Sequence, residues 1–443
     1  MINQVELRKK LDTVSLERIA KETNFTKRND GKISPLNFIL SFFISIQKDK
    51  HTLRTWAVEL AIIIRSTLSY NGMKNAQNES RAKFAKQLLE EVVQNQIQKT
   101  STTKNLISTQ LLEKFNRVFL EDSTCINLPS HLHEFFPGAY SKTGKAATAK
   151  IQLRQELKSG TYTNIELQSF RDNDQKFAPN ILKDLQANDL VIRDLGYSVL
   201  TVFKEMIDLK AFFISRLRFG INLYNSQTDE QIDLPKLLRK ARRNGQSVVE
   251  LELKVGKKAK LKTRVVAVRC PPNVTRKKRK AARENRSAKA NHSQDYMELL
   301  GWTIFITNVD VEVLSGQQLL QVYGYRWRIE IIFKCWKSHF KIDKLFNTHT
   351  KLSKQQVEIA FYLFLVWLTL FFVRMYNFFL IEVYTKKQKI LSLMKFAKFV
   401  NEHFSDLLSD PDLDYWIDHL AYYCSYKKRN DRLNFFEQCF LFN

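Results

Sequence analysis

The sequence contains few of the residues that interrupt helices, because only twelve glycines and eight prolines occur among its 443 residues. This scarcity favours long helices joined by short loops. No GxxxxGK[ST] or GxGxxG pattern occurs, so no phosphate-cradling nucleotide loop is expected. The N-terminal segment lacks the apolar core of a signal peptide, and we therefore expect a cytoplasmic protein.

Cysteine is also scarce and unpaired in its spacing. The five cysteines form no CxxC pair. An odd, scattered set excludes a disulfide scaffold and an ordinary zinc ribbon, and it is typical of a reducing cytoplasm. The cysteines are Cys125, Cys270, Cys335, Cys424 and Cys439.

Only one run of apolar residues is long enough to raise the question of a membrane. Residues 359–373 are 15 strongly apolar residues between Glu358 and Arg374. A membrane-spanning helix needs about 20 residues, and the segment that follows is amphipathic. We therefore expect a buried core helix and no membrane partner, with a transmembrane helix as the alternative.

Positive charge, in contrast, is abundant. The chain has 71 Lys and Arg against 45 Asp and Glu, a formal net charge of +26. Residues 251–290 hold fifteen Lys and Arg and two Glu, so half of the excess lies in this segment. Residues 401–443 hold eight acidic and four basic residues and do not belong to that basic surface. Such a balance indicates an anionic partner.

The densest part of this charge is a run of five basic residues that is predicted to open a polar helix without an apolar stripe. A charge run is often only a solvated face. The functional interpretation is a surface that contacts the phosphate backbone of a nucleic acid, which gives affinity but little sequence choice. The run consists of Arg276, Lys277, Lys278, Arg279 and Lys280.

Hydrophobic periodicity divides the chain into four segments, the last of which the family resemblance described below divides again at residue 350. Residues 1–110 are predicted to be helical, and residues 111–220 alternate strands and helices as in a mixed α/β layer. Strand patterns return around the basic run in residues 221–310. Residues 311–350 and 351–443 are again predicted to be helical.

Local signals within these segments predict where some elements begin or turn. Ser34, followed by Pro35, and Ser80 are predicted N-caps of two helices in the first segment. Ser159-Gly160 separates two strand patterns and predicts a β-hairpin.

Three acidic residues stand out by their position. Asp122 lies in the first predicted strand of the α/β segment, and Asp194 ends another predicted strand. Glu330 lies within residues 323–340, which we interpret as one helix. Each acid alone is weak support for a site, because a carboxylate at a strand end is usually a cap or a turn residue.

On that predicted helix, four polar residues fall on one face. At 100° per residue, Tyr323, Arg326, Glu330 and Lys337 occupy an arc of about 60° opposite an apolar face. Carboxylates hold divalent cations, and Arg, Lys and Tyr bind phosphates, so this face suits a site for both. The alternative is a surface helix on which Arg326 and Glu330 form an ordinary ion pair.

The spacing Tyr323-x2-Arg326-x3-Glu330-x6-Lys337 resembles the Y-R-E-K signature of DDE transposases of the insertion-sequence-four type, which move DNA by cut and paste. Asp122-Ser-Thr and Asp194-Leu-Gly-Tyr resemble the acidic motifs of the same family. One position departs from related proteins, because Leu195 stands where a basic residue is common.

The resemblance implies an α/β fold with an RNase H-like catalytic core interrupted by a β-rich insertion. In this interpretation residues 1–110 form a helical DNA-binding domain, and 111–220 and 311–350 form the two parts of the core. Residues 221–310 are the basic β-rich insertion. Residues 351–443 are a helical C-terminal region.

The resemblance also implies the chemistry. Asp122, Asp194 and Glu330 would be the catalytic, metal-binding triad for two Mg²⁺ ions, for which Mn²⁺ can substitute. Phosphates of the DNA would contact Tyr323, Arg326 and Lys337. Trp302 stands where the family places an aromatic residue that stacks on a flipped base during hairpin formation, and Trp327 is expected to contact DNA; for both, a place in the core is the alternative.

The implied partner is double-stranded DNA, both transposon ends and target, bound by a homodimer in a synaptic complex within the bacterial nucleoid. Two other functions stay open at this point. One is a catalytically inactive, transposase-derived DNA-binding protein, and the other is a different RNase H-like nuclease.

Overall fold

The computed structural model of the protein describes residues 11, 15–25, 32–48, 51–100, 110–141, 144–287, 290–346 and 351–427. Residues 101–109 and the tail from residue 428, with Cys439, lie outside the described residues. The chain forms two compact units. The helical unit comprises the described residues up to 100, 123–171 and 330–427, and the sheet unit comprises 110–122 and 172–329.

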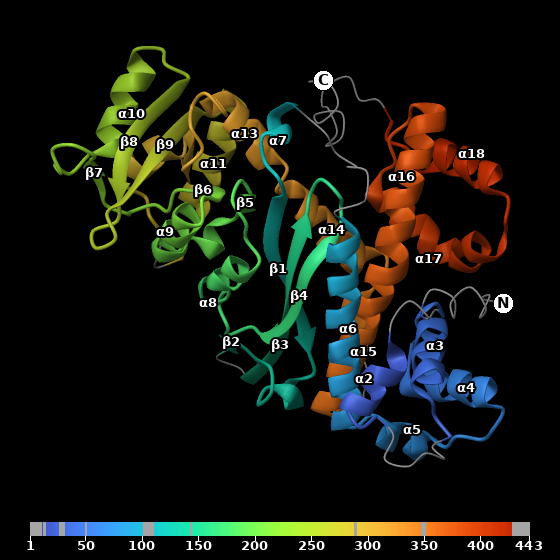
Figure 1. Cartoon of the computed structure of the whole chain (residues 1–443). Helices are drawn as coiled ribbons and strands as arrows, with labels where there is room; N and C mark the ends of the chain where they lie inside the picture. The colour runs from blue at the N-terminus through green and yellow to red at the C-terminus, as the bar shows by residue number, and fades with distance from the viewer. Residues whose placement is uncertain are drawn as a thin grey trace. The chain divides into compact units, whose positions relative to one another are not determined.

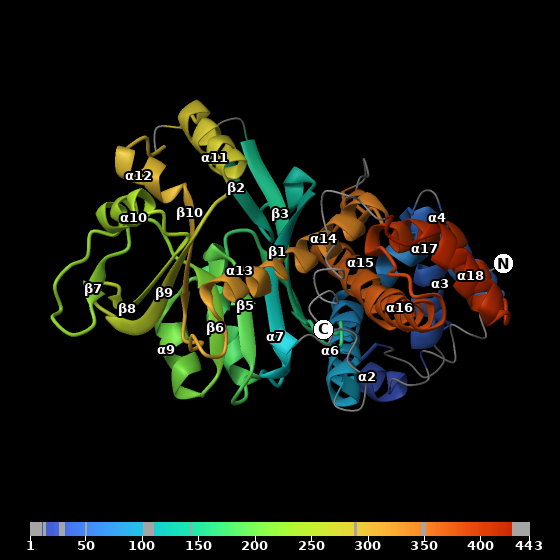
Figure 2. The same cartoon turned by 90° about the horizontal axis from the view of Figure 1, so that it is seen from above.

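In the sheet unit, the strands follow the order β1-β5-β6-β10-β9-β8-β7 (Figure 1; Figure 2 also labels β10). The first three strands are parallel, and the remaining pairs are antiparallel. The strands of residues 221–310 thus extend the sheet that begins in residues 111–220. The bounds are β1 Val118–Leu128 (which continues into the helical unit from residue 123), β5 Leu190–Arg193, β6 Phe212–Arg216, β7 Leu223–Asn225, β8 Val248–Val255, β9 Leu261–Arg269 and β10 Trp302–Thr307.

Helices of the sheet unit bury apolar side chains against these strands. Phe203 of α9 stacks on Phe213 of β6, with ring centroids 4.3 Å apart. The short strand–helix order predicted for residues 111–220 is therefore confirmed in this unit. The helices are α7 Gln110–Glu113, α8 Asp174–Phe177, the 3₁₀ helices η2 Ala178–Lys183 and η3 Leu195–Tyr197, α9 Leu200–Asp208, α10 Leu234–Arg243, α11 Pro272–Glu284, α12 Gln294–Leu299 and α13 Gly316–Gly324.

The helical unit contains the remaining elements, including the predicted hairpin. Its turn holds Gly160 at φ +69°, in the left-handed region that glycine adopts readily. The elements are α2 Leu16–Glu22, α3 Pro35–Ile46, α4 Leu53–Ile64, α5 Tyr70–Ala76, α6 Glu79–Thr100, η1 Ser130–Leu132, β2 Pro137–Ser141, β3 Gly144–Glu156, β4 Tyr162–Ser169, α14 Trp327–Ser338 (its residues from 330 on), η4 Ile342–Lys344, α15 Lys354–Trp367, the π-helix η5 Leu368–Val373, α16 Arg374–Lys387, α17 Leu393–Ser409 and α18 Leu413–Tyr423.

The two predicted N-caps have different outcomes. Ser34 caps α3, and its side chain accepts a hydrogen bond from the backbone N–H of Asn37. The prediction for Ser80 is wrong, because α6 begins at Glu79 and Asn78 accepts from the N–H of Arg81 at 3.2 Å. Asparagine is as strong an N-cap as serine, and Asn78 precedes Ser80, so the helix begins two residues earlier than the prediction for Ser80 required.

The apolar segment 359–373 lies in a continuous helix from Lys354 to Lys387. By length and composition this helix could cross a membrane, but 94% of its most apolar window is buried in the structure. Within the helical unit, Gln96 of α6 donates from Nε2 to the carbonyl of Thr369 at 2.8 Å. The expectation of a buried core helix is confirmed.

Candidate active site

Two of the three predicted acids meet at one edge of the sheet unit. The parallel strands β1 and β5 pair Glu121 with Arg193. Asp122 and Asp194 are the next residues on each strand, directly after the last residue pair of β1 and β5, so both carboxylates lie side by side on the same face. One position earlier, on the opposite face, the fully buried Glu121 and Arg193 form an ion pair at 2.5 Å. This pair ties the two strands together below the aspartates.

Arg216 extends this row, and we did not predict it from the sequence. Strand β6 is parallel to β5, with Arg193 paired to Ser215, so Arg216 follows in register with Asp194. The Nε of Arg216 is buried and has no hydrogen-bond partner among the described residues. The sequence signal for Arg216 is only its place within a predicted strand, residues 211–220, and its neighbours follow from the strand order.

Residues near the end of α13 reach both aspartates. The Tyr323 hydroxyl donates to Oδ1 of Asp194 at 3.5 Å, and Nη1 of Arg326 lies 3.5 Å from Oδ2 of Asp122. Both contacts are long and therefore weak. The Arg326 guanidinium also lies over the Tyr323 ring, 5.7 Å from its centroid. The structure thus brings together Asp122, Asp194, Tyr323 and Arg326.

Tyr323 is an ionisable group held in its neutral form. Only 9% of the residue is exposed. Burial raises the pKa of its phenol to about 12; Asp194 adds to this, and the guanidinium groups of Arg326 and Arg216 oppose it. Near neutral pH the phenol therefore keeps its proton and acts as a hydrogen-bond donor.

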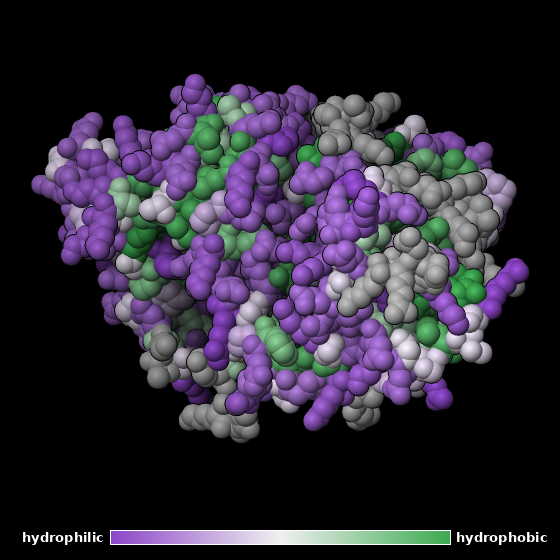
Figure 3. All heavy atoms as spheres, turned by 60° about the horizontal axis from the view of Figure 1, so that its bottom comes forward, coloured by the Kyte–Doolittle hydropathy of each residue, from purple (hydrophilic) through white to green (hydrophobic). Residues whose placement is uncertain are grey.

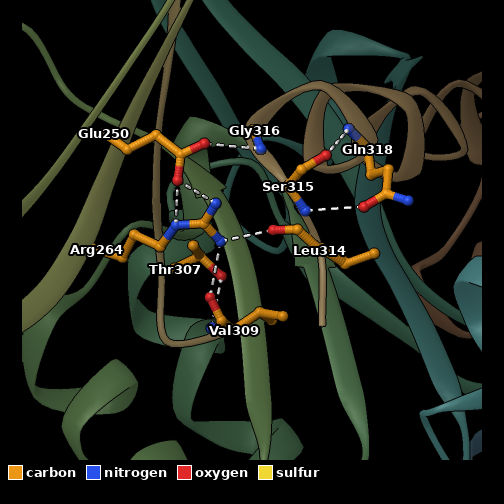
Figure 4. Close-up of polar contacts among 8 residues, drawn as sticks. All are labelled: Glu250, Arg264, Thr307, Val309, Leu314, Ser315, Gly316 and Gln318. Atoms are coloured by element: carbon orange, nitrogen blue, oxygen red, sulfur yellow. Dashed lines mark hydrogen bonds and ion pairs between the residues drawn. The ribbon is translucent and has the colours of Figure 1, made fainter. Parts of the chain in front are cut away.

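A polar network fixes α13, the helix that carries Tyr323, to the sheet. Figure 4 shows Arg264 of β9 paired with Glu250 of β8 and donating to the carbonyls of Val309 and Leu314. The other oxygen of Glu250 accepts from the N–H of Gly316, the first residue of α13, at 2.9 Å. These contacts hold the start of α13 in place, and thereby its far end with Tyr323.

The prediction of one helix over residues 323–340 is wrong. Helix α13 ends at Gly324 and α14 begins at Trp327, with Tyr325 and Arg326 in a turn between them. The N–H groups of these two residues bond to the carbonyls of Val322 and Tyr323, three positions back, so the α-helical pattern of bonds to the fourth preceding residue is interrupted here. The predicted arc of four side chains therefore does not apply across the turn.

Glu330 and Lys337 lie on α14 after this turn, in the helical unit. Glu330 is partly buried, and Lys337 is exposed. Among the described residues, no group of three or more His, Cys, Asp and Glu side chains is placed to hold a metal ion. The two adjacent aspartates are nevertheless the oxygen ligands that Mg²⁺ and Mn²⁺ prefer.

The two tryptophans differ in their surroundings. Trp302, at the start of β10, is only 2% exposed and belongs to the core of the sheet unit. It also lines a cavity of about 750 Å³ together with Arg216 and Lys278. Its indole N–H has no partner among the described residues. Trp327 is 56% exposed.

The predicted basic helix is confirmed as α11, which buries none of its residues. Its side chains nevertheless face different surroundings. Lys278 lies 3.2 Å from the sulfur of Cys270, and Arg279 donates to the carbonyl of Met297 at 2.9 Å. Arg276, Lys277 and Lys280 are exposed.

Comparison with known proteins identifies the class. A family model described as the transposase DDE domain matches residues 113–368, more than half of the chain, and the chain therefore belongs to the DDE transposase family. The matched range includes Asp122, Asp194 and the whole Y-R-E-K spacing.

Among individual proteins of known name, the chain is similar to transposases of insertion sequence elements. The chain is 28% identical to the transposase of insertion sequence element IS231E of Bacillus thuringiensis subsp. finitimus, over 90% of this chain and 84% of that protein. It is 26% identical to the IS1151 transposase of Clostridium perfringens, over 76% and 74%. These relatives confirm the resemblance to the insertion-sequence-four type. A piggyBac transposase in a synaptic complex with hairpin DNA is similar at a TM-score of 0.42, with 10% identity over 96% of this chain and 84% of that chain.

Proposed function

We propose that this protein cuts a mobile DNA element at its terminal inverted repeats and joins the 3′ ends to target DNA by metal-dependent phosphoryl transfer. The observation that carries the proposal is the edge where Asp122 and Asp194 lie side by side, contacted by Arg326 and Tyr323. Carboxyl ends of parallel strands are a common place for ligands in α/β sheets. The parallel strands β1, β5 and β6, with α9 packed on them, support an RNase H-like core.

Asp122, Asp194 and Glu330 would hold two Mg²⁺ ions, for which Mn²⁺ can substitute. When bound, the ions stabilise charge on the attacking and leaving oxygens of an in-line displacement. The aspartates supply adjacent hard oxygen ligands. Glu330, on α14, would complete the set.

The basic and phenolic groups of the site would position the DNA. Arg326 and Tyr323 lie beside the aspartates, so a phosphate at this edge would contact a guanidinium and a neutral phenol. Lys337 and the basic residues of α11 would bind phosphates farther along the DNA. These contacts would give affinity and orientation, because phosphate contacts carry no sequence information directly.

A hairpin intermediate is the route that we propose for the second strand. The cavity beside Trp302 is lined by apolar residues, by Arg216 and Lys278 and by two acids, Asp233 and Asp295; its apolar and basic side chains would hold a flipped base and its phosphate. The exposed ring of Trp327 would stack on DNA. We propose further that two copies act as a homodimer on double-stranded DNA when both ends are brought together, in the cytoplasm and associated with the nucleoid.

The test is Mg²⁺-dependent nicking of DNA that carries the ends of the element. We expect Asp194→Ala to abolish nicking, because one of two adjacent metal ligands is lost. Glu330→Gln should abolish nicking while leaving end binding largely in place. The matched control is Asp208→Ala, an exposed acid at the end of α9.

Nicking by Asp194→Ala at the rate of Asp208→Ala would show that the site assignment is wrong. End binding without any nicking by the wild-type protein would favour the inactive DNA-binding alternative. Nicking without preference for the element ends would favour another RNase H-like nuclease.

A further inference from the structure

Five arginines line one cavity of the sheet unit to which neither β1 nor β5, the strands of the aspartates, contributes a residue. The cavity has a volume of about 810 Å³, and none of its lining residues is acidic. Figure 2 shows α10, α11 and α12 at the same end of this unit. We call this feature the arginine pocket, and its arginines are Arg242, Arg269, Arg276, Arg279 and Arg283.

The pocket is built by the fold rather than by a run of charge. Arg276, Arg279 and Arg283 are spaced by three and four residues and therefore share one face of α11. Lys278, on the opposite face, lines the cavity beside Trp302 instead. Only part of the basic run thus contributes to the pocket, and Arg242 of α10 and Arg269 of β9 join it from other elements.

Two of the arginines are held in place by neighbours. Arg242 donates from Nε to Glu298 at 3.0 Å, and Arg279 donates from Nε to the carbonyl of Met297 at 2.9 Å. Both anchors belong to α12, so this helix orients the two guanidinium groups. A guanidinium fixed through Nε still has its terminal N–H groups for a ligand.

The other three arginines have no neutralising partner. Arg269, Arg276 and Arg283 are exposed, and in the part of the chain that the structure describes they form no ion pair. Bringing these like charges together is unfavourable unless an anion joins them. Guanidinium groups match phosphate geometry with two parallel hydrogen bonds.

A second cavity of about 430 Å³ shares Arg279 and Arg283 with the arginine pocket; Arg239 also lines it, and its one acidic lining residue, Glu298, is paired with Arg242. Two cavities that share cationic residues suit a ligand with repeated anionic groups better than a single phosphate. We propose that the arginine pocket binds consecutive phosphates of a DNA strand. This inference rests on the proposed action on DNA and assigns a binding site outside the catalytic edge.

The experiment measures binding of the full-length protein to a duplex DNA over a series of salt concentrations by fluorescence anisotropy. We expect Arg276→Gln/Arg283→Gln to weaken binding about tenfold or more and to lower the log–log salt slope by about 2, since two phosphate contacts are lost. The charge-matched control is Lys257→Gln/Lys258→Gln, two exposed lysines at the β8–β9 turn, with at most about a threefold loss.

A third variant, Arg276→Lys/Arg283→Lys, separates geometry from charge. It should bind between the wild-type and glutamine variants, because lysine keeps the charge but loses the planar pair of donors. Because α11 buries no side chain, all variants should keep the thermal midpoint of the wild-type protein.

Three outcomes would overturn the inference. If Arg276→Gln/Arg283→Gln and the control Lys257→Gln/Lys258→Gln lost equal affinity for the duplex, only the total charge would matter. Inorganic pyrophosphate that binds the pocket, with duplex binding unchanged in the arginine variants, would assign the pocket to a free polyphosphate. Absence of duplex binding by the wild-type protein would contradict this site and the proposed function together, whereas nicking lost in Asp194→Ala supports the function by itself.

Discussion

Ionisable side chains of this protein take their properties from the elements packed around them. Burial raises the pKa of the Tyr323 phenol to about 12, and its hydroxyl donates to Asp194. Glu121 and Arg193 are fully buried one position from the aspartates and pair with each other. Removing one member of such a pair leaves an uncompensated buried charge, which costs about 3–5 kcal/mol. The intact pair therefore keeps β1 and β5, the strands that hold the aspartates, joined at this position.

A histidine in the helical unit gives a pH dependence of stability. The His51 ring packs against Phe42 and Trp56, and burial lowers its pKa to about 4. Its ordinary pKa is 6.5, so between about pH 6.5 and 4 the unfolded chain binds a proton that the folded chain does not. The free energy of unfolding should therefore fall by about 1–3 kcal/mol as the pH decreases through this range.

We expect His51→Gln to flatten this part of the pH profile. Urea unfolding followed by tryptophan fluorescence at several pH values between 4 and 7 measures the effect. His292→Gln, at an exposed histidine of the sheet unit, is the control and should keep the wild-type profile. A His51→Gln profile as steep as that of the wild-type protein would contradict the prediction.

At the scale of elements, the hydrophobic pattern was sufficient to predict most strands and helices from the sequence, because each of them buries side chains at a regular spacing. The helix break at Tyr325 and Arg326 was not predictable in this way. Polar residues on both sides fit one helical period, and the break is made by bonds to carbonyls three positions back. Arg216 was missed for a related reason, since its role depends on which strand lies beside β5.

Helix α13 begins and ends with a glycine, and the two differ in the space that is available for a Cβ atom. A Cβ on Gly316 would lie 2.6 Å from Cγ1 of Val248 and 2.7 Å from Oε1 of Glu250, whereas a Cβ on Gly324 meets nothing within 4 Å. We expect Gly316→Ala to lower the free energy of unfolding by about 1–3 kcal/mol. Gly324→Ala should leave it unchanged or raise it by up to about 1 kcal/mol.

Because Gly316 anchors α13 through Glu250, its substitution should also reduce nicking of end DNA more than Gly324→Ala does. Chemical denaturation gives the stability, and a nicking assay under native conditions gives the activity. If both variants behaved alike, the close contact at Gly316 would not position α13.

At the scale of the whole molecule, the densest positive charge and the most apolar helix lie in different units of the chain. Half of the excess positive charge lies in residues 251–290, which supply part of the arginine pocket. The most apolar helix, Lys354–Lys387, is buried within the helical unit. Figure 3 shows one face of the molecule on which hydrophilic side chains predominate, with hydrophobic patches between them. The formal net charge of +26 favours association with an anionic polymer, whereas the apolar helix is buried in the protein.

This separation predicts how the protein behaves when cells are broken without detergent. In low salt, the charge should hold the protein on nucleic acid, so that part of it sediments. Nuclease or high salt should release it to the supernatant, because counterions compete with the phosphate contacts. A helix inserted in a membrane would respond to neither treatment and would need detergent. Fractionation with each treatment, followed by immunoblotting, measures the distribution; release by detergent alone would contradict the buried position of Lys354–Lys387.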